Sequence, residues 1–133
     1  MKIKKITFDY HGDNRGKLIA IEENRDIDFD VKRVYYMFDT VNDAIRGKHA
    51  HKSLEQILIC TSGSCKVLLD DGYKKTIVTL NNPCEGLYIS NAIWREMYDF
   101  SKDAVLMVLA SNYYDESDYI RDYDEFIKYV GAK

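Results

Sequence analysis

Proline is nearly absent from this sequence: Pro83 is the only one, and the seven glycines are scattered along the 133 residues. Such a composition excludes a proline- or glycine-rich linker, and the chain shows no internal repeat or low-complexity segment. The length is typical of one hydrophobic core. We therefore expect a single domain over residues 1–133.

Cysteine, charge of one sign and long apolar runs are scarce as well. Three cysteines without CxxC spacing, Cys60, Cys65 and Cys84, indicate neither a disulfide framework nor a zinc site. The net charge of −3 includes no block of like charges, so we expect no nucleic-acid partner and no binding to membrane surfaces. Without a signal-peptide pattern or about 18 consecutive apolar residues, the protein is predicted to be cytoplasmic.

What the sequence does contain is a series of short segments rich in β-branched and aromatic residues, separated by turn signals. This pattern is typical of a β-sandwich or barrel. The Asp71-Gly72 step predicts a tight hairpin, because glycine tolerates the positive φ of such turns. Strands are expected at residues 32–38, 55–60, 65–69, 75–80, 86–89 and 104–110.

The tail of the chain has a different period. Between Asp115 and Val130 the apolar residues recur at helical spacing, and several acidic residues near the start suit the helix dipole. We expect a C-terminal helix that packs on the sheet of an otherwise all-β fold.

The candidate site centres on His49 and His51, two of only three histidines in the chain. On an extended segment, side chains two residues apart lie on one face, so both imidazoles are expected to point the same way, with Glu55 on the same side. The third histidine, His11, is expected in a surface loop. Two imidazoles on one face predict a site for proton transfer.

The spacing Gly47-x-His49-x-His51-x-x-x-Glu55 resembles the first conserved motif of the cupin superfamily, whose double-stranded β-helix barrels often use the two histidines and the glutamate as metal ligands. This resemblance implies a jelly-roll cupin fold. Metal-binding cupins supply another histidine from a second motif, where this sequence has Arg95. A guanidinium cannot coordinate a cation, although three ligands can still hold zinc or iron. We expect neither a metal nor an organic cofactor.

A narrower resemblance rests on several segments together: Arg33-Val34-Tyr35-Tyr36, Arg46 to Lys52, Gln56 and the tail from Val108 to Tyr123. This joint pattern is similar to the dTDP-4-keto-6-deoxyhexose 3,4-ketoisomerases, small cupins that make precursors of 3-amino-3,6-dideoxyhexoses for surface polysaccharides. The similarity implies conversion of dTDP-4-keto-6-deoxy-D-glucose to its 3-keto isomer without a cofactor. It also implies a homodimer that exchanges N-terminal strands.

The implied chemistry assigns catalytic roles. A proton leaves C3 and the resulting enediol is reprotonated at C4, which requires positioned acids and bases with pKa values near neutrality. By the resemblance, His49 is the base at C3 and His51 is the partner that serves the oxygens or C4. Tyr35 shares the inward face with Arg33 if the strand alternates, and its hydroxyl is expected to stabilise the enediolate or to orient His49. A packed core tyrosine is the alternative.

Substrate binding is expected to depend on arginines, because the chain as a whole is acidic. Arg46 is predicted to hold the diphosphate through bidentate contacts, with a solvated turn residue as the alternative, and Arg33 is also assigned to the substrate. Trp94 and Arg95 are expected to line the barrel mouth, although a packed tryptophan suits the sequence equally well. Arg15, in an Arg-Gly turn, resembles family members that give the galacto-configured product.

Two other classes of function stay open from the sequence. One is a metal-dependent cupin enzyme that uses His49, His51 and Glu55, and the other is a cupin that binds a sugar nucleotide without chemistry. A related outcome is epimerisation at C3 or C5, because epimerases of the same pathways also use cupin folds and histidine bases. Metal analysis, deuterium exchange and NMR of the product distinguish these hypotheses.

Overall fold

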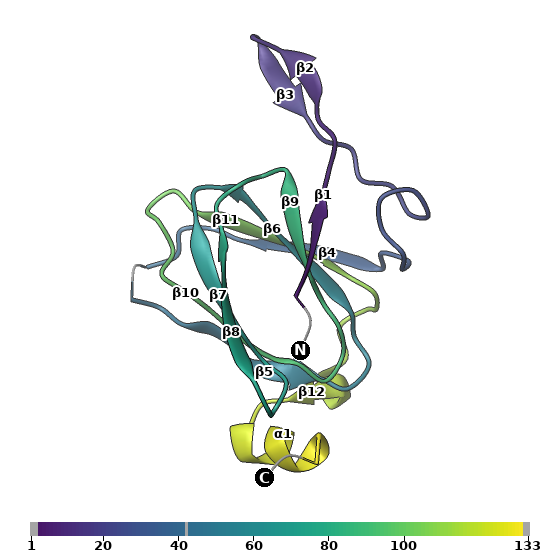
Figure 1. The fold of residues 1–133 in the computed structure, drawn as a ribbon, viewed down its shortest axis with the longest axis vertical. Coiled ribbons are helices and arrows are strands. Elements are labelled where there is room, and N and C mark those ends of the chain that lie inside the picture. Colours follow the sequence, from purple (N-terminus) through teal and green to yellow (C-terminus); the bar gives the residue numbers. More distant parts are fainter. Residues whose placement is uncertain (1–2, 42, 132–133) are drawn as a thin grey trace.

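The structure is a computed structural model that describes residues 3–41 and 43–131. Two five-stranded antiparallel sheets face each other and enclose the core (Figure 1). In spatial order the first sheet consists of β1 (Lys4–Thr7), β9 (Glu85–Ile89), β6 (Gln56–Ser62), β11 (Val105–Ala110) and β4 (Arg33–Met37). The second consists of β12 (Tyr119–Ile120), β5 (Arg46–His51), β10 (Trp94–Tyr98), β7 (Cys65–Asp70) and β8 (Lys75–Leu80). The predicted all-β cupin fold is confirmed.

Alternate side chains of each strand fill the space between the sheets, because the pleat sends successive residues to opposite faces. On β7, for example, Cys65, Val67 and Leu69 are buried, whereas Lys66 and Leu68 are only partly covered. All six predicted strands are present, and the predicted hairpin joins β7 to β8. Burial of one face therefore explains the alternating sequence pattern of strands such as β7.

The C-terminal tail corrects the prediction of one helix from 115 to 130. A short 3-10 helix, η1 (Glu116–Asp118), leads into β12, and only α1 (Tyr123–Tyr129) is α-helical. Tyr119 and Ile120 pair with β5, so tertiary pairing overrides their helical spacing. The helix begins where the Asp122 carboxylate accepts a hydrogen bond from the Glu125 amide. Within the described residues, no helix has the length and apolar character needed to cross a membrane.

Helix α1 covers the outer face of the second sheet near β5 (Figure 1). Phe126 is fully buried there and packs with Ala50, Trp94 and Ile120. Ala50 lies between the two histidines of interest, so its outward direction leaves those histidines facing the barrel interior. The tail thereby fixes the strand that carries the candidate site.

A two-stranded hairpin, β2 (His11–Asp13) and β3 (Gly16–Leu18), projects away from the barrel (Figure 1). We call residues 10–18 the arm. All six strand residues of the arm are exposed, including Leu18, and the two strands pair only with each other. The sequence predicted a loop at this place.

Candidate active site

A β-bulge in β5 determines how the two histidines are presented. The register between β5 and β10 pairs His49 with Arg95 and Gly47 with Glu96, so Lys48 is the extra residue. Gly47 and Lys48 both have positive φ, 85° and 57°. After this bulge the strand continues regularly, and His49 and His51 share the inward face as predicted.

His49 is half-buried, and the backbone determines which of its nitrogens carries the proton. Its Nδ1 lies 3.0 Å from the carbonyl oxygen of Gly47, which can only accept a hydrogen bond. The neutral ring therefore donates through Nδ1 and keeps Nε2 unprotonated. This is the form in which an imidazole acts as a base.

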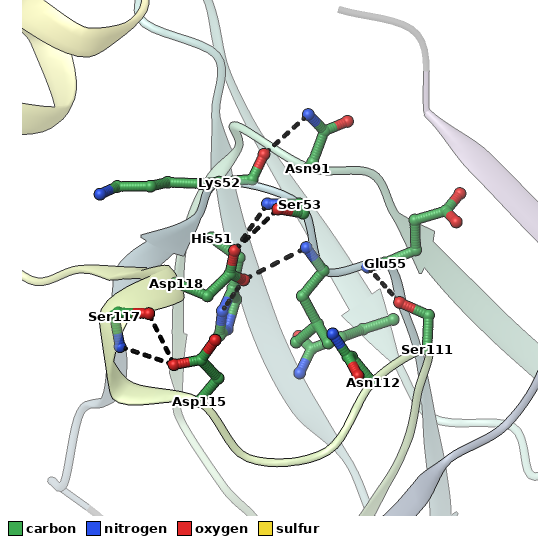
Figure 2. Close-up of polar contacts among 12 residues, drawn as sticks. His51, Lys52, Ser53, Glu55, Asn91, Ser111, Asn112, Asp115, Ser117 and Asp118 are labelled. Carbon is green, nitrogen blue, oxygen red and sulfur yellow. Dashed lines mark hydrogen bonds and ion pairs between the residues drawn. The ribbon is translucent and has the colours of Figure 1, made fainter.

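His51 lies behind His49 and is 1% exposed. The two rings meet edge to face at 4.8 Å between centroids, and Tyr119 packs against both. The Nδ1 of His51 lies 3.3 Å from the Asp118 carboxylate (Figure 2). The histidine pair thus has one member at the cavity and one member beneath it.

Both imidazoles are held neutral by their surroundings. Burial, reinforced by the positive charge of Arg95, lowers the pKa of His49 from 6.5 to about 4. Burial, with Arg95 and His49 as the next causes, lowers the pKa of His51 to about 2. At neutral pH both rings are therefore unprotonated, and both pKa values lie below the near-neutral values expected from the sequence.

A chain of donors runs from Arg95 to the cavity. The Arg95 guanidinium is 1% exposed and donates to the Gln56 side-chain oxygen at 2.5 Å and to the carbonyl of Ile93. Gln56 in turn donates from its amide nitrogen to the Tyr35 hydroxyl oxygen at 3.0 Å. Because that oxygen accepts from Gln56, the proton of the Tyr35 hydroxyl is free to be donated into the cavity.

The cavity in front of His49 has a volume of about 340 Å³. Three arginines and three tyrosines line it together with His49; they are Arg33, Arg46, Arg121, Tyr35, Tyr114 and Tyr119. The Arg33 guanidinium lies over the rings of Tyr35 and Tyr114, and that of Arg121 lies 4.2 Å from the centre of the Tyr119 ring. Flat cations beside aromatic faces suit a ligand that combines anionic groups with a ring.

Several predicted positions are corrected. Glu55 does not join the histidines, since its carboxylate accepts a hydrogen bond from the Tyr88 hydroxyl on the outer side of the first sheet. Trp94 does not line the mouth, because its ring is 3% exposed and packs under α1 on Phe126. Arg95 is near the histidines but buried beneath them. Arg15 lies on the arm, paired with Asp13 and absent from the lining of this cavity.

Because Glu55 does not lie with the histidines, only two of the three proposed metal ligands, His49 and His51, remain together. Among the described residues, no three His, Cys, Asp or Glu side chains come close enough together to hold a metal ion. Apart from the Asp118 carboxylate behind His51, the groups around His49 and His51 are cationic or aromatic. Such groups favour an anionic ligand over a cation.

Sequence reasoning did not assign Gln56, Asp118, Tyr119 or Arg121 to the site. The tail was expected to be one helix, and β12 instead places Tyr119 opposite His51. The sequence did contain one signal for them, because Gln56 and the tail belong to the set of segments that resembles the 3,4-ketoisomerases. That pattern marked the segments without showing which side chains reach the cavity.

Comparisons with known proteins show the family to which this chain belongs. A family model described as "FdtA: WxcM-like, C-terminal" matches residues 1–131. A TDP-4-oxo-6-deoxy-alpha-D-glucose-3,4-oxoisomerase of Aneurinibacillus thermoaerophilus is 58% identical over 130 residues, which cover 98% of this chain and 94% of that protein.

Solved structures are similar over the same length. A 3,4-ketoisomerase from Helicobacter canadensis is 51% identical, with a TM-score of 0.95 and coverage of 98% of both chains. A mutant of the 3,4-ketoisomerase QdtA from Thermoanaerobacterium thermosaccharolyticum, in complex with TDP-4-keto-6-deoxyglucose, is 48% identical with a TM-score of 0.94. The match covers 96% of this chain and 93% of that one.

Proposed function

Because this chain belongs to the FdtA family (WxcM-like, C-terminal), we propose that it is a TDP-sugar 3,4-ketoisomerase acting on TDP-4-keto-6-deoxyglucose. The observation that carries this proposal is His49: a neutral imidazole with a free Nε2 at a cavity surrounded by arginines. We further infer that the enzyme works in the cytoplasm on precursors of 3-amino-3,6-dideoxyhexoses for surface polysaccharides, as the family resemblance implies.

The reaction exchanges the positions of a ketone and a hydroxyl on neighbouring carbons. His49 takes the proton from C3, and the electron pair of that C–H bond forms the C3–C4 double bond while the C4 carbonyl oxygen becomes an anion. C4 then gains a proton that replaces the one taken by His49, and the C3 hydroxyl proton is transferred to the C4 oxygen, which leaves a ketone at C3 and a hydroxyl at C4. One carbon is oxidised as the other is reduced, so the sum requires no external oxidant or reductant.

Tyr35 supports the proposal as the group that stabilises the enediolate oxygen. Its hydroxyl proton is free for donation, and the Gln56 amide on its oxygen links it to the buried Arg95 cation. Burial is the main cause that raises the pKa of Tyr35, so the hydroxyl stays protonated at neutral pH. A donor that is already positioned when charge develops lowers the barrier without reorganisation.

Arginines at the mouth account for the nucleotide part of the substrate. Arg33, Arg46 and Arg121 line the cavity from three different segments, and guanidinium groups bind diphosphate oxygens in pairs. Arg121 is also bonded to Glu116, which keeps its guanidinium over Tyr119. We assign Arg33, Arg46 and Arg121 to the diphosphate.

The arm supports a homodimer with exchanged N-terminal segments. Residues of the arm make no sheet pairing with their own barrel, and Arg15 at its tip is far from the lining of its own cavity. A hairpin of two strands is marginally stable alone, so a second copy is a suitable partner. In that dimer Arg15 would reach the neighbouring site and act on the C4 configuration, for which we propose the galacto product.

The activity is tested by incubating the protein with TDP-4-keto-6-deoxyglucose in D2O and following the sugar by NMR. We expect a 3-keto product that carries deuterium at C4, and the coupling constants of the C4 proton in a parallel reaction in H2O report its configuration. H49N should be inactive, because asparagine retains a donor for the Gly47 carbonyl but lacks the base. The variant should still bind TDP.

The other hypotheses give different results in the same experiment. A binding protein leaves the sugar unexchanged, and an epimerase exchanges C3 or C5 while the ketone stays at C4. A metal enzyme loses activity on chelation, whereas we expect full activity with EDTA. Any of these three results contradicts the proposal.

The exchanged arm is tested by complementation between H49N, which lacks the base, and R15A, which is expected to lose the galacto configuration of the product, with formation of the galacto product as the readout. If arms exchange, a mixed dimer contains one site with both His49 and the partner subunit's Arg15, so statistical mixing restores about a quarter of the wild-type sites. If each arm serves its own barrel, no mixed dimer contains a complete site. Unfolding and refolding the mixture before the assay allows the subunits to redistribute.

A further inference from the structure

Asp118 presents its carboxylate to the buried histidine of the site. One oxygen, Oδ2, lies 3.3 Å from the Nδ1 of His51, and Figure 2 shows the two side chains pointing toward each other. Neither nitrogen of His51 has a conventional hydrogen bond to another described residue. The carboxylate is therefore the acceptor available to Nδ1.

The connection between β5 and β6 holds this carboxylate in place. Its Oδ1 accepts hydrogen bonds from the Ser53 amide at 2.9 Å and the Ser53 hydroxyl at 3.0 Å, and its Oδ2 accepts from the Leu54 amide at 3.2 Å. The backbone of Asp118 also accepts from the Lys52 amide. Such donors favour the ionised carboxylate and fix its direction.

The direction matters because a neutral imidazole has two tautomers. For His49 the Gly47 carbonyl selects the form with the proton on Nδ1, but no backbone carbonyl of residues 3–41 or 43–131 accepts a hydrogen bond from His51. A carboxylate beside Nδ1 selects the same form, since an ionised carboxylate only accepts. The opposite tautomer would place two acceptors 3.3 Å apart inside the protein.

We propose that Asp118 is a positioning residue that fixes His51 as the Nδ1–H tautomer and leaves its Nε2, on the side of the ring away from the carboxylate, free to receive a proton. This inference rests on the proposed function for its catalytic meaning, because a free Nε2 is needed only if His51 handles a proton of the sugar. Its structural content, the tautomer, is independent of any substrate. A carboxylate of the C-terminal tail, that of Asp118, thus selects the tautomer of His51 on β5.

The test compares D118N with the wild type and with D115N. In D118N the amide oxygen is expected at the place of Oδ1, where it keeps the two donors of Ser53, whereas the amide nitrogen takes the place of Oδ2, loses the one donor of Leu54 and donates to His51. The proton of His51 is then forced onto Nε2. Asp115 loses the same charge in D115N within the same turn, but its carboxylate contacts Ser117 and not His51.

Two measurements follow for the three proteins. Long-range 1H–15N NMR of histidine-labelled protein, assigned by the loss of signals in H51N, should show Nδ1–H for His51 in the wild type and D115N and Nε2–H in D118N. With TDP-4-keto-6-deoxyglucose, kcat of D118N should fall at least about tenfold with little change in KM, since an acid or base contributes roughly 10²–10⁴-fold. D115N should retain its kcat.

The results separate the failure of this inference from failure of the proposed function. An Nε2–H tautomer in the wild type, an unchanged tautomer in D118N, or an equal loss of kcat in D115N overturns the role of Asp118. A wild-type protein that does not isomerise the sugar overturns the function instead, and the tautomer measurement then still decides whether Asp118 orients His51.

Discussion

Arg95 is a cation buried without a carboxylate in hydrogen-bonding contact. Burial alone lowers its pKa to about 10, so it stays charged at neutral pH. An isolated buried charge is costly unless neighbouring groups solvate it, and Gln56 and the Ile93 carbonyl supply that solvation here. Because these groups are neutral, the positive charge of Arg95 is not cancelled, and it disfavours protonated histidines and favours an anionic intermediate.

Tyr35 and Tyr36 allow this interpretation to be tested on adjacent residues of one strand. Y35F removes the donor to the enediolate, so kcat should fall about 10²-fold or more, by analogy with the loss of one oxyanion donor. Y36F is the control, because Tyr36 is exposed on the opposite face of β4 and should retain full activity. Steady-state kinetics on both variants decide the point.

Equal activity of Y35F and the wild type would contradict the assignment of Tyr35. The stability of Y35F should change by only about 1 kcal/mol, the usual contribution of one hydrogen bond, here the one from Gln56. Chemical denaturation checks that a loss of activity does not come from unfolding.

At the scale of the element, β5 depends on glycine at its bulge. A Cβ on Gly47 would lie 3.0 Å from both the Arg95 carbonyl oxygen and the Met97 sulfur, on a backbone with φ of 85°. We predict that G47A destabilises the fold by about 1–3 kcal/mol and lowers kcat, because the Gly47 carbonyl that orients His49 moves.

Gly131 provides a matched control for this substitution. Its φ is 75°, but a Cβ there meets no atom of the described residues within 4 Å. G131A should therefore incur the backbone strain alone and retain wild-type kcat. Denaturation curves and kinetics of the two variants separate strain from displacement of His49; an equal effect on kcat would contradict the role of the bulge.

The barrel elements show what the sequence can and cannot predict. Runs of β-branched and aromatic residues between turn signals identified β4, β6, β7, β8, β9 and β11, and the alternation of β4 correctly placed Tyr35 with Arg33. The predicted C-terminal helix is present as α1, but its predicted extent was wrong because Tyr119 and Ile120 fit a helical period equally well and only their pairing with β5 decides. Local spacing contains no information on which distant strand a segment joins.

The site was also predicted only in part, because local spacing fixes which residues share a strand face but not which distant residues lie nearby. His49 and His51 share a strand, so their common face followed from spacing, whereas Glu55 lies beyond the end of β5 and turns outward. Trp94 and Arg95 are neighbours on β10 and point to opposite faces, one under α1 and one beneath the histidines. Contacts between strands of one sheet, such as that of Gln56 on β6 with Tyr35 on β4, depend on register alone.

For the whole molecule, burying neutral histidines makes stability depend on pH. The unfolded chain binds protons at a pKa near 6.5, whereas folding lowers the pKa of His49 to about 4 and of His51 to about 2. Stability is therefore unaffected by these groups above about pH 6.5 and falls as the pH drops below it. The linkage predicts a loss of about 2–3 kcal/mol for each histidine by pH 4.5.

Variants of the histidines isolate this contribution from that of the carboxylates. H51N should lose about 2 kcal/mol less than the wild type between pH 7.5 and pH 4.5 in urea denaturation. H11N, at an exposed position on the arm, should follow the wild type. Parallel curves for H51N and the wild type would contradict the burial of a neutral His51.

The pairing of β12 with β5 also determines when the site is completed during synthesis. Strands β4 to β11 leave the ribosome before the tail, but His51 obtains Tyr119 and Asp118 only after those late residues have emerged. A nascent chain stalled before the tail has both histidines without their covering ring and carboxylate. Because of the order of residues along the chain, His51 obtains its contacts with Tyr119 and Asp118 only when the barrel is nearly complete.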